Sequence, residues 1–228
     1  MSVRLDSTLS GILRLTASPD VPFTLMGWFY IHTLPVANGV LLGHWNGGTL
    51  KILSTGVLQL RTSGGTGDGS ATLSTGTWYH LTLTRAAPNA DTGLFHVHID
   101  GSATPDIVRS DYHQDGDLIQ FSDYWDGTNL ADISLAKARL WASVLDDAEI
   151  AAEYASATPV KASPWATWPL AVHTDITDDS GNGRNLTSGG TISTNADNPT
   201  FGAAAQPSDS RQLPRGRVRG LHRGLVSV

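Results

Sequence analysis

Apolar and polar residues alternate along most of this chain, in short runs that end at glycine, asparagine, aspartate or proline. Alternation with a period of two is the pattern of a β-strand that buries one face. It predicts strands over residues 11–17, 23–32, 39–45, 49–54, 57–62, 77–85, 94–100, 117–122 and 131–145. Many short strands with close turns predict an all-β sandwich or jelly roll.

The clearest pattern is a hairpin over residues 77–101. Aromatic, leucine and β-branched residues fill the runs 77–85 and 94–100, and Asp100-Gly101 ends the second run. Such a pair of runs with an Asp-Gly turn is typical of antiparallel strands. By contrast, residues 63–70, SGGTGDGS, predict a flexible polar loop.

One helix is predicted, and it begins after Asp146. Glu149 follows three residues later, so the two side chains form the pattern of a capping box. Ile150 and Tyr154 are four residues apart and share one helix face. Pro159 prevents further helix, so we expect a short helix packed across a sheet.

The C-terminal part divides into three segments. Strand-like patterns return over 165–171 and 178–193, and we expect these strands to join the same sandwich as the rest of residues 1–201. Residues 202–210 predict a linker, and residues 211–228 predict a basic arm.

Composition excludes several classes of protein. Cysteine is absent, so disulfides, thiolate metal sites and cysteine nucleophiles are excluded. Arg4, Asp6 and Arg14 interrupt the first 20 residues, which therefore do not resemble a signal peptide. No run approaches the ~18 apolar residues of a membrane span. We expect synthesis in a cytoplasm without export.

Charge is divided unevenly. The formal net charge is −6, but five arginines and no acid lie in residues 211–228. The other 10 basic residues face all 21 acidic ones, so residues 1–210 carry −11 and the arm carries +5. A block of one charge sign is typical of an interaction tail.

Four segments in order are similar to the concanavalin A-like lectin/glucanase superfamily, in particular its laminin G-like and pentraxin-like branch. These are FTLMGWFYI from Phe23, the hairpin from Trp78 and His80 to Asp100-Gly101, the run from Leu140-Trp141 to Glu149-Ile150, and the closure from Trp168 to SGNG at residues 180–183. The resemblance implies an all-β fold, a two-sheet antiparallel jelly-roll sandwich. Its members include sugar binders, glycosidases, adhesion modules and structural domains, so it does not fix the function.

Catalytic patterns are weak. The glucanases of the superfamily carry Glu-x-Asp-x-x-Glu, but this chain has only Glu149 and Glu153, both on the predicted helix. Asp123 and Asp126 are the alternative carboxylate pair for a glycosidase, or part of an acidic surface loop. No Gly-x-Ser-x-Gly elbow is present. We therefore expect no enzymatic activity.

Three groups of residues are candidate metal ligands. His80, His96 and His98 share one face of the hairpin, either as metal ligands or, as we favour, as packed strand residues. The resemblance suggests calcium, and loop carboxylates would supply its oxygen ligands, or else form a solvated loop. These carboxylates are Asp111, Asp115 and Asp117. A similar group, Asp175, Asp178 and Asp179, is better explained as capping a glycine turn.

Glycan binding would use aromatic residues in loops beside acids and amides. The candidates are Tyr112, Tyr124, Trp125, Asp126 and Asn129. Trp28, Trp78, Trp141 and Trp168 lie at strand positions and are predicted to be core, whereas Trp45 and Trp165 are unassigned.

The arm predicts docking to other subunits. Its docking residues are Arg211, Arg215, Arg217, Arg219, Leu221, Arg223 and Leu225. An acidic partner or neighbouring subunit is favoured over nucleic acid. We expect a homo-oligomeric, non-enzymatic structural or adhesion protein of a larger assembly, namely a bacteriophage virion, as a decoration, tail or fibre component. The alternatives are a free lectin, with or without calcium, and then a glycosidase.

Overall fold

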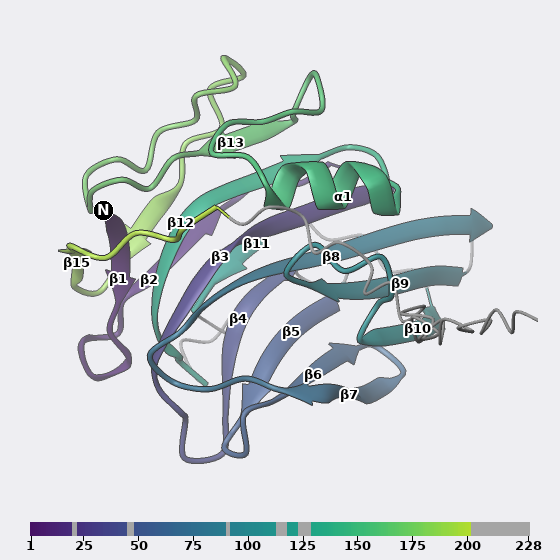
Figure 1. Ribbon diagram of the computed structural model, residues 1–228, viewed down its shortest axis with the longest axis horizontal. Coiled ribbons are helices and arrows are strands. Elements are labelled where there is room, and N and C mark those ends of the chain that lie inside the picture. The colour runs from purple at the N-terminus through teal and green to yellow at the C-terminus, as the bar shows by residue number, and fades with distance from the viewer. Residues whose placement is uncertain (20–21, 45–47, 90–91, 113–117, 123–128, 202–228) are drawn as a thin grey trace, which may run out of the picture.

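The computed structural model describes residues 1–19, 22–44, 48–89, 92–112, 118–122 and 129–201. Within them the chain forms two antiparallel sheets that pack face to face (Figure 1). The eight-stranded sheet has the order β10 (Ile107–Tyr112), β9 (Thr92–Ile99), β8 (Trp78–Asn89), β3 (Phe23–Thr33), β12 (Asp132–Trp141), β1 (Ser2–Leu5) and β15 (Ile192–Asn195), with β13 (Ala166–Trp168) beside β12.

The seven-stranded sheet forms the other layer. Its order is β14 (Thr187–Gly189), β2 (Ile12–Leu15), β11 (Ile119–Phe121), β4 (Asn38–His44), β5 (Gly48–Leu53), β6 (Val57–Thr62) and β7 (Gly65–Thr72). The strand-like segments after residue 165 therefore add strands to both sheets, as the pattern predicts. The two-sheet antiparallel sandwich that the resemblance implies is confirmed.

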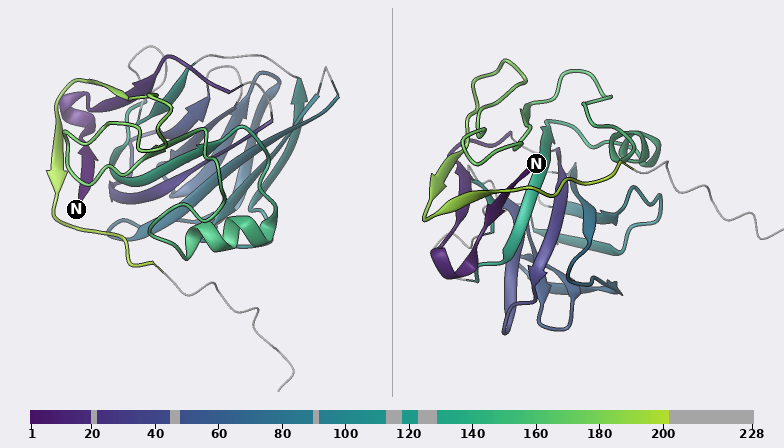
Figure 2. Two further views of the ribbon diagram at one scale, coloured as in Figure 1. Left: turned by 90° about the horizontal axis from the view of Figure 1, so that it is seen from above. Right: turned by 60° about the vertical axis from the view of Figure 1, so that its left-hand side comes forward.

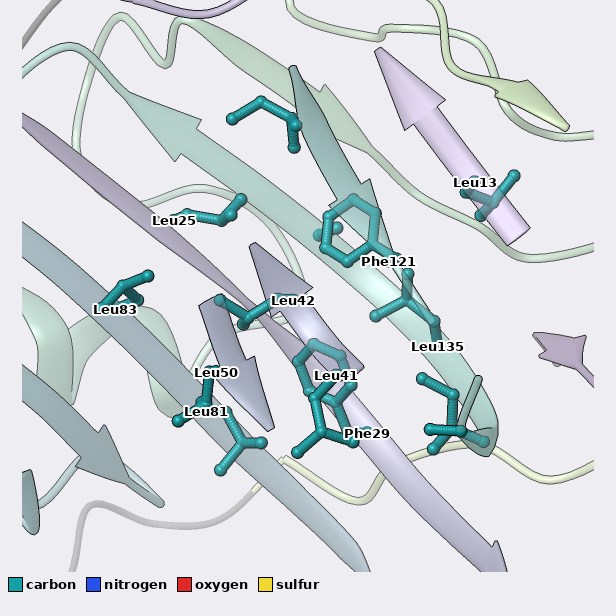
Figure 3. Packing of buried hydrophobic residues seen from close by; sticks show 14 of the residues in the cluster. Leu13, Leu25, Phe29, Leu41, Leu42, Leu50, Leu81, Leu83, Phe121 and Leu135 are labelled. Carbon is teal, nitrogen blue, oxygen red and sulfur yellow. The ribbon is translucent and has the colours of Figure 1, made fainter. Parts of the chain in front are cut away.

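The core lies between the sheets, because alternate residues of each strand face inward. On β3, Phe23, Leu25, Phe29 and Ile31 belong to this core. Figure 3 shows leucine and phenylalanine side chains of both sheets pointing toward one another. Strand β9 of the β8–β9 hairpin ends at Asp100-Gly101. Both residues have positive φ angles, 51° and 69°, as expected for a tight Asp-Gly turn.

A single α-helix of the described residues, α1 (Asp147–Tyr154), lies on the outer side of the eight-stranded sheet (Figure 2). The predicted capping box is present: Asp146 accepts from the Glu149 amide at 2.8 Å, and Glu149 accepts from the Asp146 amide at 3.1 Å. Ile150 packs into a second buried cluster with Met26, Trp141 and Leu145. A short 3₁₀ turn, η1 (Ser7–Leu9), follows β1. No described helix could cross a membrane.

The prediction of a loop at residues 63–70 is wrong. This segment forms most of β7, an edge strand that pairs with β6. Its glycines lack the side chains that mark a strand in sequence, and pairing with β6 outweighs their low β-propensity. Asp111 and Tyr112, expected in a loop, instead end β10, and β1 also has no counterpart among the predicted strands.

Candidate functional site

The structure describes only part of the predicted glycan and calcium sites. Asp111 and Asn129 are described, as is the backbone of Tyr112. Asp115, Asp117, Tyr124, Trp125 and Asp126 lie outside the described residues, as do Asp123 and the docking residues of the arm. Their predicted roles therefore stay predictions.

Asp111 joins the two sheets at their edge. Its carboxylate accepts hydrogen bonds from the Gly64 amide at 2.8 Å and from the Thr62 hydroxyl, and it lies 3.4 Å from the Arg109 guanidinium. The group thus connects β10 of one sheet to the β6–β7 hairpin of the other. A calcium ion at Asp111 would have to share a carboxylate that these donors already use.

Asp106 makes a second connection just before β10. Its Oδ1 accepts from the Ser70 amide, the Ser70 hydroxyl and the Ala71 amide at 2.8–3.0 Å. Both carboxylates approach β7 or its turn where a glycine leaves room: a Cβ on Gly69 would lie 2.0 Å from Asp106, and one on Gly64 would lie 2.3 Å from Asp111. These glycines are therefore part of the closure between the sheets.

The segment that carries the predicted aromatic residues leaves the seven-stranded sheet after β11. It returns at Asn129, whose backbone oxygen accepts from the Val40 amide at 2.7 Å and whose φ is 56°. The seven-stranded sheet presents a row of mainly polar residues on its outer face. Cross-strand pairing orders the row as Arg14, Gln120, Gly43, Thr49 and Arg61.

Gln120 is the unusual member of this row. Its neighbours Ile119 and Phe121 face the core, so its side chain faces outward, yet it is fully buried and neither amide atom has a hydrogen-bond partner. A Cβ on Gly43 would lie 3.1 Å from its amide nitrogen and 3.2 Å from the Thr49 hydroxyl, so both polar groups lie over Gly43. An amide offers both donors and an acceptor, which suits a hydroxyl-rich ligand.

Sequence reasoning missed Gln120, Gly43 and Thr49. The signal available was a polar residue between two apolar ones in a short strand, which predicts only an outward direction. Burial of an outward side chain depends on what covers the sheet, and alternation carries no information on this. The flanking polar residues are engaged: Lys51 donates to Asn38 at 3.2 Å and Gln59 to Asp68 at 2.8 Å.

The three histidines share the outer face of the eight-stranded sheet, as predicted. Burial, with a smaller contribution from the charge of Arg139, lowers the pKa of His80 to about 3, so its ring is neutral at physiological pH. His80 packs against Trp28 and Tyr154 at ring-centroid distances of 5.3 and 5.7 Å. Among the described residues no three histidines, aspartates or glutamates are grouped to hold a metal.

Both glutamates of the chain have structural partners. Glu149 belongs to the capping box and pairs with Lys161. Glu153 is fully buried, pairs with Arg139, and accepts from the Val160 and Lys161 amides at 2.8 and 2.6 Å. These positions leave neither carboxylate placed like the acid of a glycosidase, which must reach a sugar bond.

The SGNG closure is a turn around Asp178, the favoured alternative to a metal site. The Asp178 carboxylate accepts hydrogen bonds from the amides of Thr167, Ser180 and Arg184 at 2.9–3.0 Å. Burial is the largest single contribution and raises the pKa of Asp178, but the hydrogen bonds together outweigh burial, so the pKa is lowered. Trp165 is half-buried beneath the Arg184 guanidinium, 3.7 Å from the ring centroid. Trp28, Trp141 and Trp168 are buried as predicted, whereas Trp78 is only half-buried.

Together, the two sheets, the outer helix and the closing turn define a sandwich of the lectin type. Residues 8–151 match the family model described as concanavalin A-like lectin/glucanases superfamily, and the chain belongs to this superfamily. A comparison with curated proteins found no match.

Solved structures show the same fold. A proposed carbohydrate-binding protein from Bacteroides ovatus aligns with a TM-score of 0.62 at 16% identity, over 89% of this chain and 62% of that one. A native heptameric SAP-like pentraxin from Limulus polyphemus aligns with a TM-score of 0.53 at 12% identity, over 83% of this chain and 94% of that one. The chain thus spans less than two thirds of the first of these proteins.

Proposed function

We propose that this chain is a non-catalytic glycan-binding module. The proposed ligand lies on the outer face of the seven-stranded sheet at Gln120, and the other proposed contacts are Tyr124, Trp125, Asp126 and Asn129, which follow Gln120 closely in the sequence. In this proposal the aromatic residues stack on sugar rings, and the amides and Asp126 bond hydroxyl groups.

The observation that carries this proposal is the buried, unpartnered amide of Gln120. An unsatisfied buried polar group costs about 1–3 kcal/mol. A ligand hydroxyl would remove that cost if binding displaced the atoms that cover Gln120, which is 0% exposed. Gln120 precedes Asp123 by only three residues, so the amide and the predicted aromatic residues belong to one stretch of chain. The superfamily membership and the engaged state of both glutamates favour binding over catalysis.

The test is a glycan array probed with the full chain, followed by titration of the strongest ligand. Gln120→Leu removes both polar atoms and leaves a slightly smaller apolar side chain, and we expect it to weaken binding by about tenfold or more while leaving the melting temperature unchanged or higher. Gln59→Leu is the matched control, because it removes an outward amide from β6. Tyr124→Ala with Trp125→Ala should abolish binding. An array with no ligand, or equal affinities of Gln120→Leu and the natural chain, would disprove the proposal.

Calcium dependence is tested on the same array. Coordination by Asp111, Asp115 and Asp117 predicts that a chelator lowers binding and that added calcium restores it. Unchanged binding in chelator removes calcium from the proposal and leaves the Gln120 site in place.

A second proposal concerns assembly. The opposite charges of residues 1–210 and of the arm favour docking of Arg211, Arg215, Arg217, Arg219 and Arg223, with Leu221 and Leu225, on an acidic neighbour in a homo-oligomer or a virion. Analytical ultracentrifugation of the full chain should show association that weakens with salt. Replacing the five arginines by serine should yield a monomer. Equal masses for both chains would contradict this proposal.

A further inference from the structure

A pocket of about 450 Å³ lies on the outer side of the eight-stranded sheet, away from the polar row of the other sheet. Its floor includes Lys137 and Arg139 of β12 and Thr167 of β13, and its walls come from residues 157–164 and from the turn at Asp179 and Ser180. The volume is within the range of small-molecule sites, about 300–1,000 Å³.

Two polar atoms on the floor are buried without a partner. Arg139 is 2% exposed and Thr167 is 8% exposed, and neither the Arg139 Nε nor the Thr167 hydroxyl makes a hydrogen bond. The two residues are direct cross-strand partners, so their side chains stand next to each other on one face. The other two guanidinium nitrogens are engaged, one with Glu153 and one with the Ser156 backbone oxygen at 2.9 Å. The free Nε–H and the hydroxyl are therefore adjacent donors of two lining residues, buried just beneath the pocket surface, and a ligand that bonds them must displace the atoms that cover them.

The charges around the pocket limit the ligand. Arg139 is paired with Glu153, and Lys161 is paired with Glu149. Lys137 is half-buried and, within the described part of the chain, is a lining cation without an ion pair, whereas Asp179 is exposed. A cation without an ion pair beside two free donors suits a ligand group of charge −1 with two oxygens, while Asp179 is the one carboxylate among the described lining residues and would oppose a more highly charged anion.

We propose that this pocket binds a small monocarboxylic acid. One carboxylate oxygen accepts from the Arg139 Nε–H and the other from the Thr167 hydroxyl, and Lys137 supplies the balancing charge. The apolar part of the acid packs against the alanine and proline side chains of the walls, among them Ala157, Pro159 and Pro164. This proposal is independent of the proposed glycan site, which involves the other sheet.

The experiment titrates the full chain with sodium butyrate and sodium benzoate by calorimetry, with the corresponding amides and inorganic phosphate as comparison probes. We expect saturable binding of a carboxylate, at least about tenfold weaker binding of its amide, and phosphate weaker than the carboxylate. If no carboxylate binds below about 10 mM, or if amide or phosphate binds equally well, the proposal is overturned.

Variants locate the site. Arg139 is unsuitable because its loss leaves Glu153 buried without its cation. Thr167→Val replaces the hydroxyl with a methyl group and should lower carboxylate affinity about tenfold without lowering the melting temperature. Thr82→Val is the matched control, because Thr82 is also buried with an unpartnered hydroxyl but does not line the pocket. Lys137→Gln should weaken carboxylate binding with little effect on the amide. Equal effects of Thr167→Val and Thr82→Val would overturn the assignment.

Discussion

At the scale of single residues, burial determines the chemistry of side chains that are candidate ligands by residue type. His80 is a candidate metal ligand by type, but it lies 1% exposed between Trp28 and Tyr154. Removing an imidazolium from water is costly, so the neutral ring is favoured and its pKa falls. His80 is therefore a packing residue whose titration is linked to folding.

The first prediction concerns acid stability. The pKa of His80 is about 3 when folded and close to 6.5 when unfolded. Between these values the unfolded chain binds a proton that the folded chain does not, so stability is present above about pH 6.5 and is lost as the pH falls toward 3. We expect His80 to contribute a slope of about 1.4 kcal/mol per pH unit in that window.

Urea unfolding between pH 7 and 4 measures this slope, with His80→Phe as the comparison. The variant keeps an aromatic ring beside Trp28 and Tyr154 but cannot be protonated, so its stability should fall less steeply with acid. His173→Phe is the control, because His173 is exposed. Parallel pH profiles for the natural chain and His80→Phe would refute the linkage.

At the scale of elements, the sequence predicts a strand or helix correctly where nearby side chains show its pattern. Two such elements are the hairpin of β8 and β9 and the capped helix α1. Alternation, an Asp-Gly turn and a capping box all involve residues close together in the sequence, so they predict these elements. β7 is not readable, because its glycines carry no strand pattern, and its contacts with Asp106 and Asp111 come from distant residues. The same limit hides Gln120, Arg139 and Thr167, whose lack of partners is a property of three-dimensional packing.

The second prediction follows from the close approach of Asp106 to β7. Gly69→Ala places a Cβ 2.0 Å from the Asp106 carboxylate, which would have to move and give up its bonds to the Ser70 and Ala71 backbone. We expect a loss of about 1–3 kcal/mol in the free energy of unfolding.

The control for that prediction lies in the same strand. A Cβ on Gly67 meets its nearest atom at an ordinary 3.7 Å, so Gly67→Ala should be neutral or stabilise by up to about 1 kcal/mol through the unfolded chain. Both values come from urea denaturation. Equal changes for the two variants would show that the glycines of β7 act only through propensity.

At the scale of the whole molecule, one buried cluster connects distant parts of the chain. It includes Val3 of β1, Leu60 of β6 and Leu186 near β14, so strands from both ends of the described chain share a core. β1 lies between β12 and β15, which places the N-terminal strand inside the eight-stranded sheet (Figure 1). A shared core of this kind favours a single cooperative unfolding transition.

The third prediction tests that cooperativity. Val3→Ala removes buried methyl groups from the fully buried end of the cluster and should cost about 1–3 kcal/mol, whereas Val36→Ala, at a fully exposed valine, should change stability by less than about 0.5 kcal/mol. Because Val3 and Trp168 belong to the same buried cluster, thermal melts followed by far-UV circular dichroism and by tryptophan fluorescence should coincide in the natural chain and shift together in Val3→Ala. If the two probes separated, or if Val3→Ala moved only one of them, β1 and its neighbours would form a unit that unfolds independently of the rest of the sandwich.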